Sequence, residues 1–245
     1  MKKIKSALPL LLAFAISAAL FSCGGSSATK SADSAKAPDT VATVTKTIPD
    51  SAMAVPFDVL EITHMVKDYD KWRPGFNTDS TARKNSGMID LVVGRGVDSA
   101  NRIMIVLKVS DVAKAKAFAA DPRLKDVMTK YGVISKPDLE FFHVIRFNPN
   151  SHQKQWVIIT HKVKDFDAWL KVYDGEGTAK RLSNGEVDLA LARGIDDPNL
   201  VHVVFDITDM AKAKADIYSD AKKKLMMSAG VIGVPVIQFY NEADK

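Results

Sequence analysis

The chain has 245 residues, of which 47% are hydrophobic and 26% are charged. This balance excludes a largely disordered protein and indicates one or two globular domains. The net charge of +5 falls to +2 without the three lysines of an expected export signal, and no basic run carries interleaved aromatic residues, which argues against nucleic-acid binding.

Residues 1–22 have the pattern of a bacterial lipoprotein signal. Lysines precede an apolar stretch from Ala7 to Phe21, which is short for a membrane span. The stretch ends in Leu-Phe-Ser followed by Cys23, which resembles a lipobox, and Cys23 is the only cysteine. We predict lipidation there and therefore no disulfide in the mature chain. A plain signal peptide that contains a cysteine is the alternative.

Residues 23–56 are rich in Ser, Ala, Thr, Asp and Lys and contain several prolines. Such a segment cannot bury enough apolar surface to offset its ordering entropy, so we predict a flexible tether. Gly24 follows the cysteine, with no acidic residue that would favour retention in the inner membrane. We expect an exported protein anchored in the outer membrane with its folded part in the periplasm, and the cell surface is the second location.

An internal repeat of about 98 residues organises the rest of the chain. Residues Thr63–Trp72 recur as Thr160–Trp169 with seven of ten positions identical. Three further blocks match in the same order: Gly94–Asp98 with Ala192–Asp196, Asp111–Ala117 with Asp209–Ala215, and Gly132–Ile134 with Gly230–Ile232. We infer two tandem repeats, 57–150 and 151–245.

Each repeat is predicted to run strand, helix, strand, strand, helix, strand, from alternating or helical apolar spacing. The first repeat is expected to contain Val59–Val66, a helix from the N-cap Asp68 that Pro74 strains, Met88–Arg95, Arg102–Val109, a helix from Asp111 past an Asp-Pro break to Tyr131, and Leu139–Phe147. The second is expected to contain Gln155–Val163, Asp165–Leu182, Val187–Arg193, Val201–Ile207, Met210–Ala229 and Val234–Tyr240.

The βαββαβ order predicts an α+β fold made of two ferredoxin-like sandwiches, each with its helices on one face of an antiparallel sheet. The second face of each sheet must also be covered. The simplest arrangement packs the two sheets into one barrel, so that the chain forms its own pseudo-dimer.

Two residue types recur in both repeats and are candidates for a site. His64 and His161 lie late in the first strand of each repeat and are candidate general bases, or haem or metal ligands. They share the more apolar strand face, which favours packing under the helices instead. Trp72 and Trp169 on the following helix are candidates for stacking on a ligand, and core packing is the alternative.

Three further residues are candidates for ligand binding. His202 is expected close to the second of these histidines, but no third ligand has zinc-like spacing, so we predict no metal site. Arg95 and Arg193 end the second strand of each repeat, where they could bind a carboxylate. Ion pairs with the adjacent Asp98 and Asp196 are the simpler interpretation.

A set of residues in the first repeat resembles the dimeric α+β barrel superfamily, and most of all its antibiotic-biosynthesis-monooxygenase-like domains. They are His64, Val66, Asp68, Tyr69, Trp72, Arg83, Gly87, Arg95, Gly96, Asp98, Asp111, Ala115–Phe118, Asp121, Pro122, Leu124, Gly132 and Val133. The resemblance implies a fold whose members include cofactor-free oxygenases of polycyclic aromatics, haem-degrading enzymes and lactone isomerases, with a pocket between helices and sheet.

The haem-degrading members use an Asn, Trp and His set that this chain does not match, because His64 and Trp72 lie elsewhere in the unit. No catalytic role is carried over. We therefore expect a lipid-anchored envelope protein that binds a small apolar ligand or a partner protein without a cofactor. The alternative is an enzyme, a cofactor-independent monooxygenase or a haem-binding or haem-degrading protein.

Overall fold

The computed structural model describes residues 56–243, so the predicted signal, Cys23 and nearly all of the tether lie outside the described residues. The strands are β1 (Phe57–Met65), β2 (Met88–Gly96), β3 (Arg102–Val109), β4 (Asp138–Phe147), β5 (Gln155–Val163), β6 (Glu186–Gly194), β7 (Leu200–Ile207) and β8 (Val231–Glu242). The helices are α1 (Tyr69–Thr78), α2 (Ser80–Asn85), α3 (Val112–Ala119), α4 (Pro122–Lys130), α5 (Phe166–Glu176), α6 (Thr178–Ser183), α7 (Met210–Ile217) and α8 (Asp220–Ser228). Among these helices none has the length and apolar character that a membrane crossing requires.

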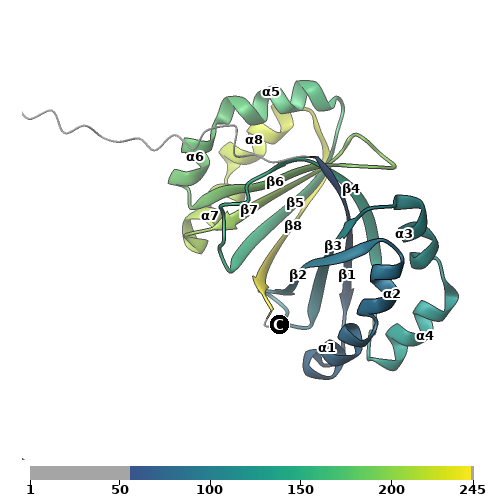
Figure 1. The fold of residues 1–245 in the computed structure, drawn as a ribbon. Helices are drawn as coiled ribbons and strands as arrows, with labels where there is room; N and C mark the ends of the chain where they lie inside the picture. The colour runs from purple at the N-terminus through teal and green to yellow at the C-terminus, as the bar shows by residue number, and fades with distance from the viewer. Residues whose placement is uncertain (1–55, 244–245) are drawn as a thin grey trace, which may run out of the picture. The chain divides into compact units, whose positions relative to one another are not determined.

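The predicted α+β class and the antiparallel strands are confirmed. Both halves of the described chain have the same order of elements, and their strands are arranged β4-β1-β3-β2 and β8-β5-β7-β6 (Figure 1). Antiparallel pairing of β2 with β8, at residues 94–96 and 240–242, joins the two sheets on one side. Pairing of β4 with β6 joins them on the other, so the eight strands form a closed barrel.

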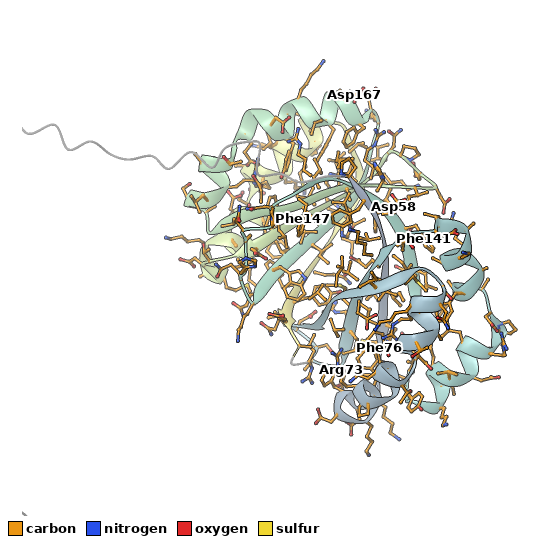
Figure 2. All side chains as sticks on the ribbon, viewed as in Figure 1. Asp58, Arg73, Phe76, Phe141, Phe147 and Asp167 are labelled. Atoms are coloured by element: carbon orange, nitrogen blue, oxygen red, sulfur yellow. The ribbon has the colours of Figure 1, made fainter. Side chains whose placement is uncertain are left out.

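The helices lie outside the barrel, each group of four over the strands of its own half (Figure 1). Two apolar clusters fill the space between helices and strands, one centred on Leu60, Trp72 and Leu107 and the other on Val157, Trp169 and Phe205. The strands also bury apolar side chains inside the barrel: Val59, Phe142, Val144, Ala192, Met104, Trp156, Ile158 and Tyr240. Figure 2 shows the side chains in both of these spaces.

The predicted long helices are pairs of short ones, which corrects three of the expected elements. The helix expected over 111–131 is divided at Asp121, whose side chain accepts a hydrogen bond from the backbone N–H of Arg123 and begins α4. The helix expected over 165–182 ends at Gly177, whose φ of 81° lies in the left-handed region that glycine adopts readily. The helix expected over 210–229 is interrupted at Ser219, whose side chain accepts a hydrogen bond from the backbone N–H of Lys222 and begins α8.

In each half an arginine of the short second helix, α2 or α6, forms hydrogen bonds to the sheet. In the first half Arg83 donates from Nε to Asp90 at 2.8 Å and from Nη1 to the carbonyl of Phe76 at 2.7 Å. In the second half Arg181 donates in the same way to Asp188 at 2.7 Å and to the Tyr173 carbonyl at 2.9 Å. Both arginine side chains are buried, and the two bonds connect the preceding helix to the second strand of each half.

The two arginines provide a matched stability test. Arg181→Leu should lower the free energy of unfolding by about 3–5 kcal/mol, because it leaves Asp188 buried without its charged partner. Arg83→Leu should cost less, since the Asp90 side chain is 42% exposed and stays hydrated. Urea unfolding of both variants measures the difference. Equal losses of unfolding free energy in the two variants would contradict the conclusion that burial of the aspartate partner determines the cost.

Candidate functional site

Four cavities adjoin the sheet in the part of the chain that the structure describes, and one of them, of about 470 Å³, lies where the start of α1 meets the ends of β2 and β8. Two others lie between the helices and strands, one in each half, and each has a volume of about 50 Å³. The fourth lies inside the barrel and has a volume of about 400 Å³. A volume near 50 Å³ holds one or two water molecules, whereas ligand pockets start at about 300 Å³.

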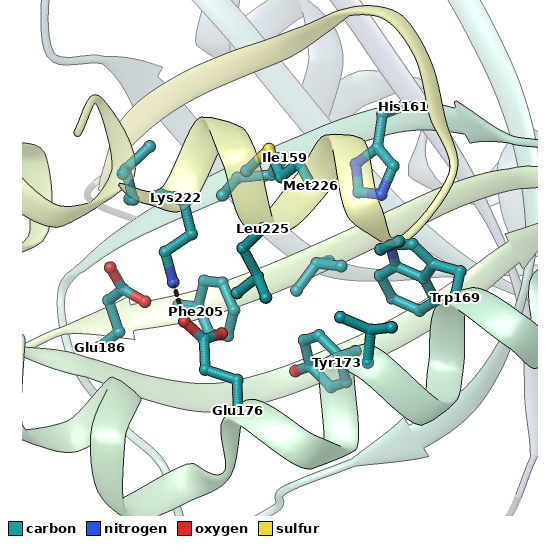
Figure 3. A pocket seen from close by; sticks show the side chains of 14 residues that line it. Ile159, His161, Trp169, Tyr173, Glu176, Glu186, Phe205, Lys222, Leu225 and Met226 are labelled. Carbon is teal, nitrogen blue, oxygen red and sulfur yellow. Dashed lines mark hydrogen bonds and ion pairs between the residues drawn. The ribbon is translucent and has the colours of Figure 1, made fainter. Parts of the chain in front are cut away.

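The two predicted histidines lie in the small cavities and pack against the predicted tryptophans. The ring centroids of His64 and Trp72 are 5.5 Å apart, and those of His161 and Trp169 are also 5.5 Å apart. Burial lowers the pKa of each histidine to about 4, and no ring nitrogen has a hydrogen-bond partner. Figure 3 shows the second pair in its pocket. The four side chains are therefore core residues.

Haem does not fit beside these histidines. Each cavity is about 50 Å³, and the space next to the imidazole is filled by the tryptophan and by other aromatic or apolar side chains. A haem needs an axial ligand together with an open distal space. Furthermore, no group of three or more His, Cys, Asp or Glu within 56–243 is placed to hold a metal ion.

The two predicted arginines do not form the expected ion pairs. Arg95 donates from Nε to the carbonyl of Ala100 at 2.9 Å, and its guanidinium lies 4.2 Å from the centre of the Tyr69 ring. Arg193 donates to the Pro198 carbonyl at 2.7 Å and lies 3.9 Å from the centre of the Phe166 ring. Each arginine thus closes its own hairpin and covers the start of the first helix.

The carboxylates expected to pair with these arginines have other partners. Asp98 pairs with Arg102 at the other side of the hairpin. Asp196 lies 2.5 Å from Nζ of Lys116, which belongs to a helix of the first half. Arg95 lines the cavity of about 470 Å³ beside β2 and β8, so its guanidinium remains a candidate for binding a ligand carboxylate.

His202 faces the interior of the barrel and not the second of the predicted histidines. On β7 it is paired with Thr160 of β5, one position away from His161. Since neighbouring residues of a strand point to opposite faces, His161 lies under the helices while His202 points into the barrel. The two residues are neighbours across the ladder, as expected, but their imidazoles point to opposite faces of the sheet.

The imidazole of His202 lies between a carboxylate and a hydroxyl. Its Nε2 is 3.2 Å from Oε2 of Glu61 on β1, and its Nδ1 is 2.9 Å from Oγ1 of Thr160. The ring stacks on Phe142 with a centroid distance of 4.2 Å. Only 6% of the His202 side chain and 13% of the Glu61 side chain is exposed. One partner comes from each half of the chain, so neither half could form this pair alone.

The sequence search missed Glu61 and Thr160, although a signal for Glu61 was present. The repeat matches Glu61 with Ile158 and His202 with Met104. At both positions one repeat has an ionisable side chain where the other has an apolar one, and both lie on an interior strand face. A polar residue that appears at only one of two matched core positions is not needed for packing. Comparison of the two repeats could therefore have identified Glu61 and His202 as candidate site residues.

The barrel cavity has apolar walls and polar side chains at its exposed end. Its walls consist of Phe57, Val59, Leu91, Val92, Met104, Val106, Val144, Phe147, Trp156, Ile158, Leu189, Ala190, Ala192 and Val204. Phe147, labelled in Figure 2, belongs to β4. The exposed end is lined by Ser151, His152, Gln153, Asp206 and Glu242, and Glu61 with His202 lies at the enclosed end.

The small cavity of the second half contains a cluster of charges that the first half lacks (Figure 3). Nζ of Lys222 is 2.5 Å from Glu176 and 2.8 Å from Asp216. Glu186, 1% exposed, has no hydrogen-bond partner on either carboxyl oxygen. Burial, opposed by Lys222, raises its pKa to about 7. The repeat places Met88 opposite Glu186, so the fold does not require this carboxyl group.

The fold is found in other solved structures. An anthrone oxidase-like protein has a TM-score of 0.53 and 12% identity over 77% of this chain and 92% of its own. A haem-binding protein from Thermus thermophilus has a TM-score of 0.49 and 11% identity, over 78% and 92% of the two chains. The first of these likenesses shows the fold and carries no residue role across. No family model matches the sequence, and no curated protein matches it either.

Glu186 should make stability depend on pH. Its pKa is 4.5 in an ordinary setting and about 7 in the fold, so the folded state binds the proton more tightly. The resulting stabilisation is complete below pH 4.5 and is lost as the pH rises through 7. Glu186→Gln should remove this component, and Glu186→Met, the residue of the first half, should be more stable than wild type at pH 8.

Urea midpoints measured between pH 4 and pH 8 test this expectation. The matched control is Asp167→Asn, which changes an exposed carboxyl group at the start of α5. The same pH slope in wild type and in both Glu186 variants would contradict it.

Proposed function

We propose that this protein binds a small, largely apolar molecule inside the barrel, with the carboxylate of Glu61 accepting a hydrogen bond from the ligand. The observation that carries the proposal is a cavity of about 400 Å³ that has apolar walls and a buried pair of Glu61 and His202 at its enclosed end. This combination of apolar lining and few polar groups is typical of ligand sites.

Glu61, not His202, is the group that faces the ligand. Both nitrogens of His202 are engaged, one by Thr160 and one by Oε2 of Glu61. If the imidazole is neutral, it donates from Nε2 to Glu61 and accepts at Nδ1 from the threonine hydroxyl. If it is protonated, it donates from both nitrogens. In either state Glu61 is held as an acceptor, and its Oε1 is left for a donor on the ligand.

We further propose that the barrel arises from an internal duplication within the dimeric α+β barrel superfamily. The repeated sequence blocks and the identical order of elements in both halves support this. Lipidation at Cys23 and the segment 23–56 would hold the binding domain at the outer membrane, on the periplasmic side or at the cell surface. A protein partner in the envelope is the alternative occupant that the sequence left open.

A monooxygenase-like oxidoreductase is the second candidate, and a specific feature favours it. A buried carboxylate in an apolar cavity is a suitable general base, and the fold is shared with an anthrone oxidase-like protein. A CH₂ group between aromatic rings would lose a proton to Glu61, and dioxygen and the proton would add to the carbanion as a hydroperoxide. Loss of water would then leave a ketone, so that dioxygen is the only oxidant.

Binding can be tested with N-phenyl-naphthylamine, an apolar fluorophore with one N–H donor. We expect saturable binding of one molecule per chain. Val204→Phe, which adds a ring inside the cavity, should weaken binding by about tenfold or more. Val234→Phe is the control, because Val234 is 91% exposed and does not line the cavity.

Glu61→Gln separates binding from catalysis. The amide can still accept a hydrogen bond, so the fluorophore should bind within about tenfold of wild type, whereas dioxygen consumption with anthrone should be abolished if Glu61 is a base. Undiminished consumption would exclude that role. Fluorophore binding that is unaffected by Val204→Phe would contradict the barrel cavity as the binding site.

A further inference from the structure

The exposed end of the barrel cavity has two carboxylates, Asp206 and Glu242, of which only Asp206 is buried. Asp206 lies on β7 and is only 2% exposed. Its Oδ2 accepts hydrogen bonds from the hydroxyl of Ser151 and, at 3.1 Å, from the backbone N–H of Gln153. Both donors belong to the segment between the two halves, which also lines the cavity. The bonds to Oδ2 leave Oδ1 for another donor.

The fold that the two halves share does not require a carboxylate at position 206. The repeat matches it with Lys108, which is exposed and lies 5.1 Å from the centre of the Phe57 ring. At this end of the barrel the second half therefore has a buried carboxylate where the first half has an exposed cation. Burial also raises the pKa of Asp206, which shows that its surroundings compensate the charge only in part.

A stretch of apolar side chains separates the two polar ends of the barrel cavity. His202 and Asp206 are four residues apart on the same face of β7, which places their Cα atoms about 13 Å from each other. Val204 lies between them, and Trp156 and Ile158 line the same stretch from β5. A ligand that contacts both polar ends must therefore be elongated.

We infer that the ligand is an elongated apolar molecule with a hydrogen-bond donor at each end, one bound by Glu61 and the other by Asp206. This inference rests on the proposed binding function and adds the ligand's shape and polarity. Since both ends of the cavity present carboxylates, a dicarboxylate of the same length would be repelled, whereas hydroxyl or amine groups would be accepted.

A series of three probes tests the inference on the whole chain: biphenyl, biphenyl with one para-hydroxyl group, and biphenyl with a hydroxyl group at both para positions. Displacement of N-phenyl-naphthylamine measures their affinities. Each added hydroxyl should tighten binding by about five- to tenfold. Asp206→Ala removes the acceptor, so it should abolish the gain from the second hydroxyl and leave the affinity of the one-hydroxyl probe unchanged.

Ser151→Ala is the matched control for the segment that Asp206 holds. It removes one bond to that segment and keeps the carboxylate, so the gain from the second hydroxyl should persist. Equal binding of the one-hydroxyl and two-hydroxyl probes to wild type would overturn this inference while leaving the proposed function intact. Failure of all three probes to displace the fluorophore, or the absence of fluorophore binding, would overturn the proposed function.

Discussion

The joining of the two four-stranded sheets along both edges determines where every other group can lie. Each strand then has one face under the helices and one face inside the barrel, so a shift of one residue moves a side chain from one environment to the other. His161 and His202 illustrate this constraint: they are neighbours across β5 and β7, yet one packs on a tryptophan under the helices and the other pairs with Glu61 in the cavity.

The strands and the fold class could be predicted from the sequence because alternating apolar residues fix a strand face and the repeat allows each element to be read twice. The helix interruptions of the second half could not be predicted, although the Asp-Pro pair marked the one in the first half. Gly177 and Ser219 lie within apolar patterns that continue on both sides, and only the packing of each short helix on the sheet determines where the chain turns. The face of His202 depends on the register between β5 and β7, which a pattern within one strand does not contain.

Divergence between the two halves is more informative about function than their similarity. The residues that both halves share, such as His64 and His161, are buried in small cavities and serve packing. Three ionisable residues of the barrel interior, Glu61, His202 and Asp206, have an apolar or exposed counterpart in the other repeat. A chain that contains both halves can change one of two matched positions and keep the other, which separate identical subunits cannot do.

The two joints between the sheets are unequal, and this affects how a molecule could enter the barrel. The pairing of β2 with β8 spans three residue pairs, whereas that of β4 with β6 spans five. Local opening follows the places with the fewest hydrogen bonds to break. The barrel would therefore open first between β2 and β8, while the longer pairing of β4 with β6 stays intact. A ligand could then enter the cavity without unfolding of either half.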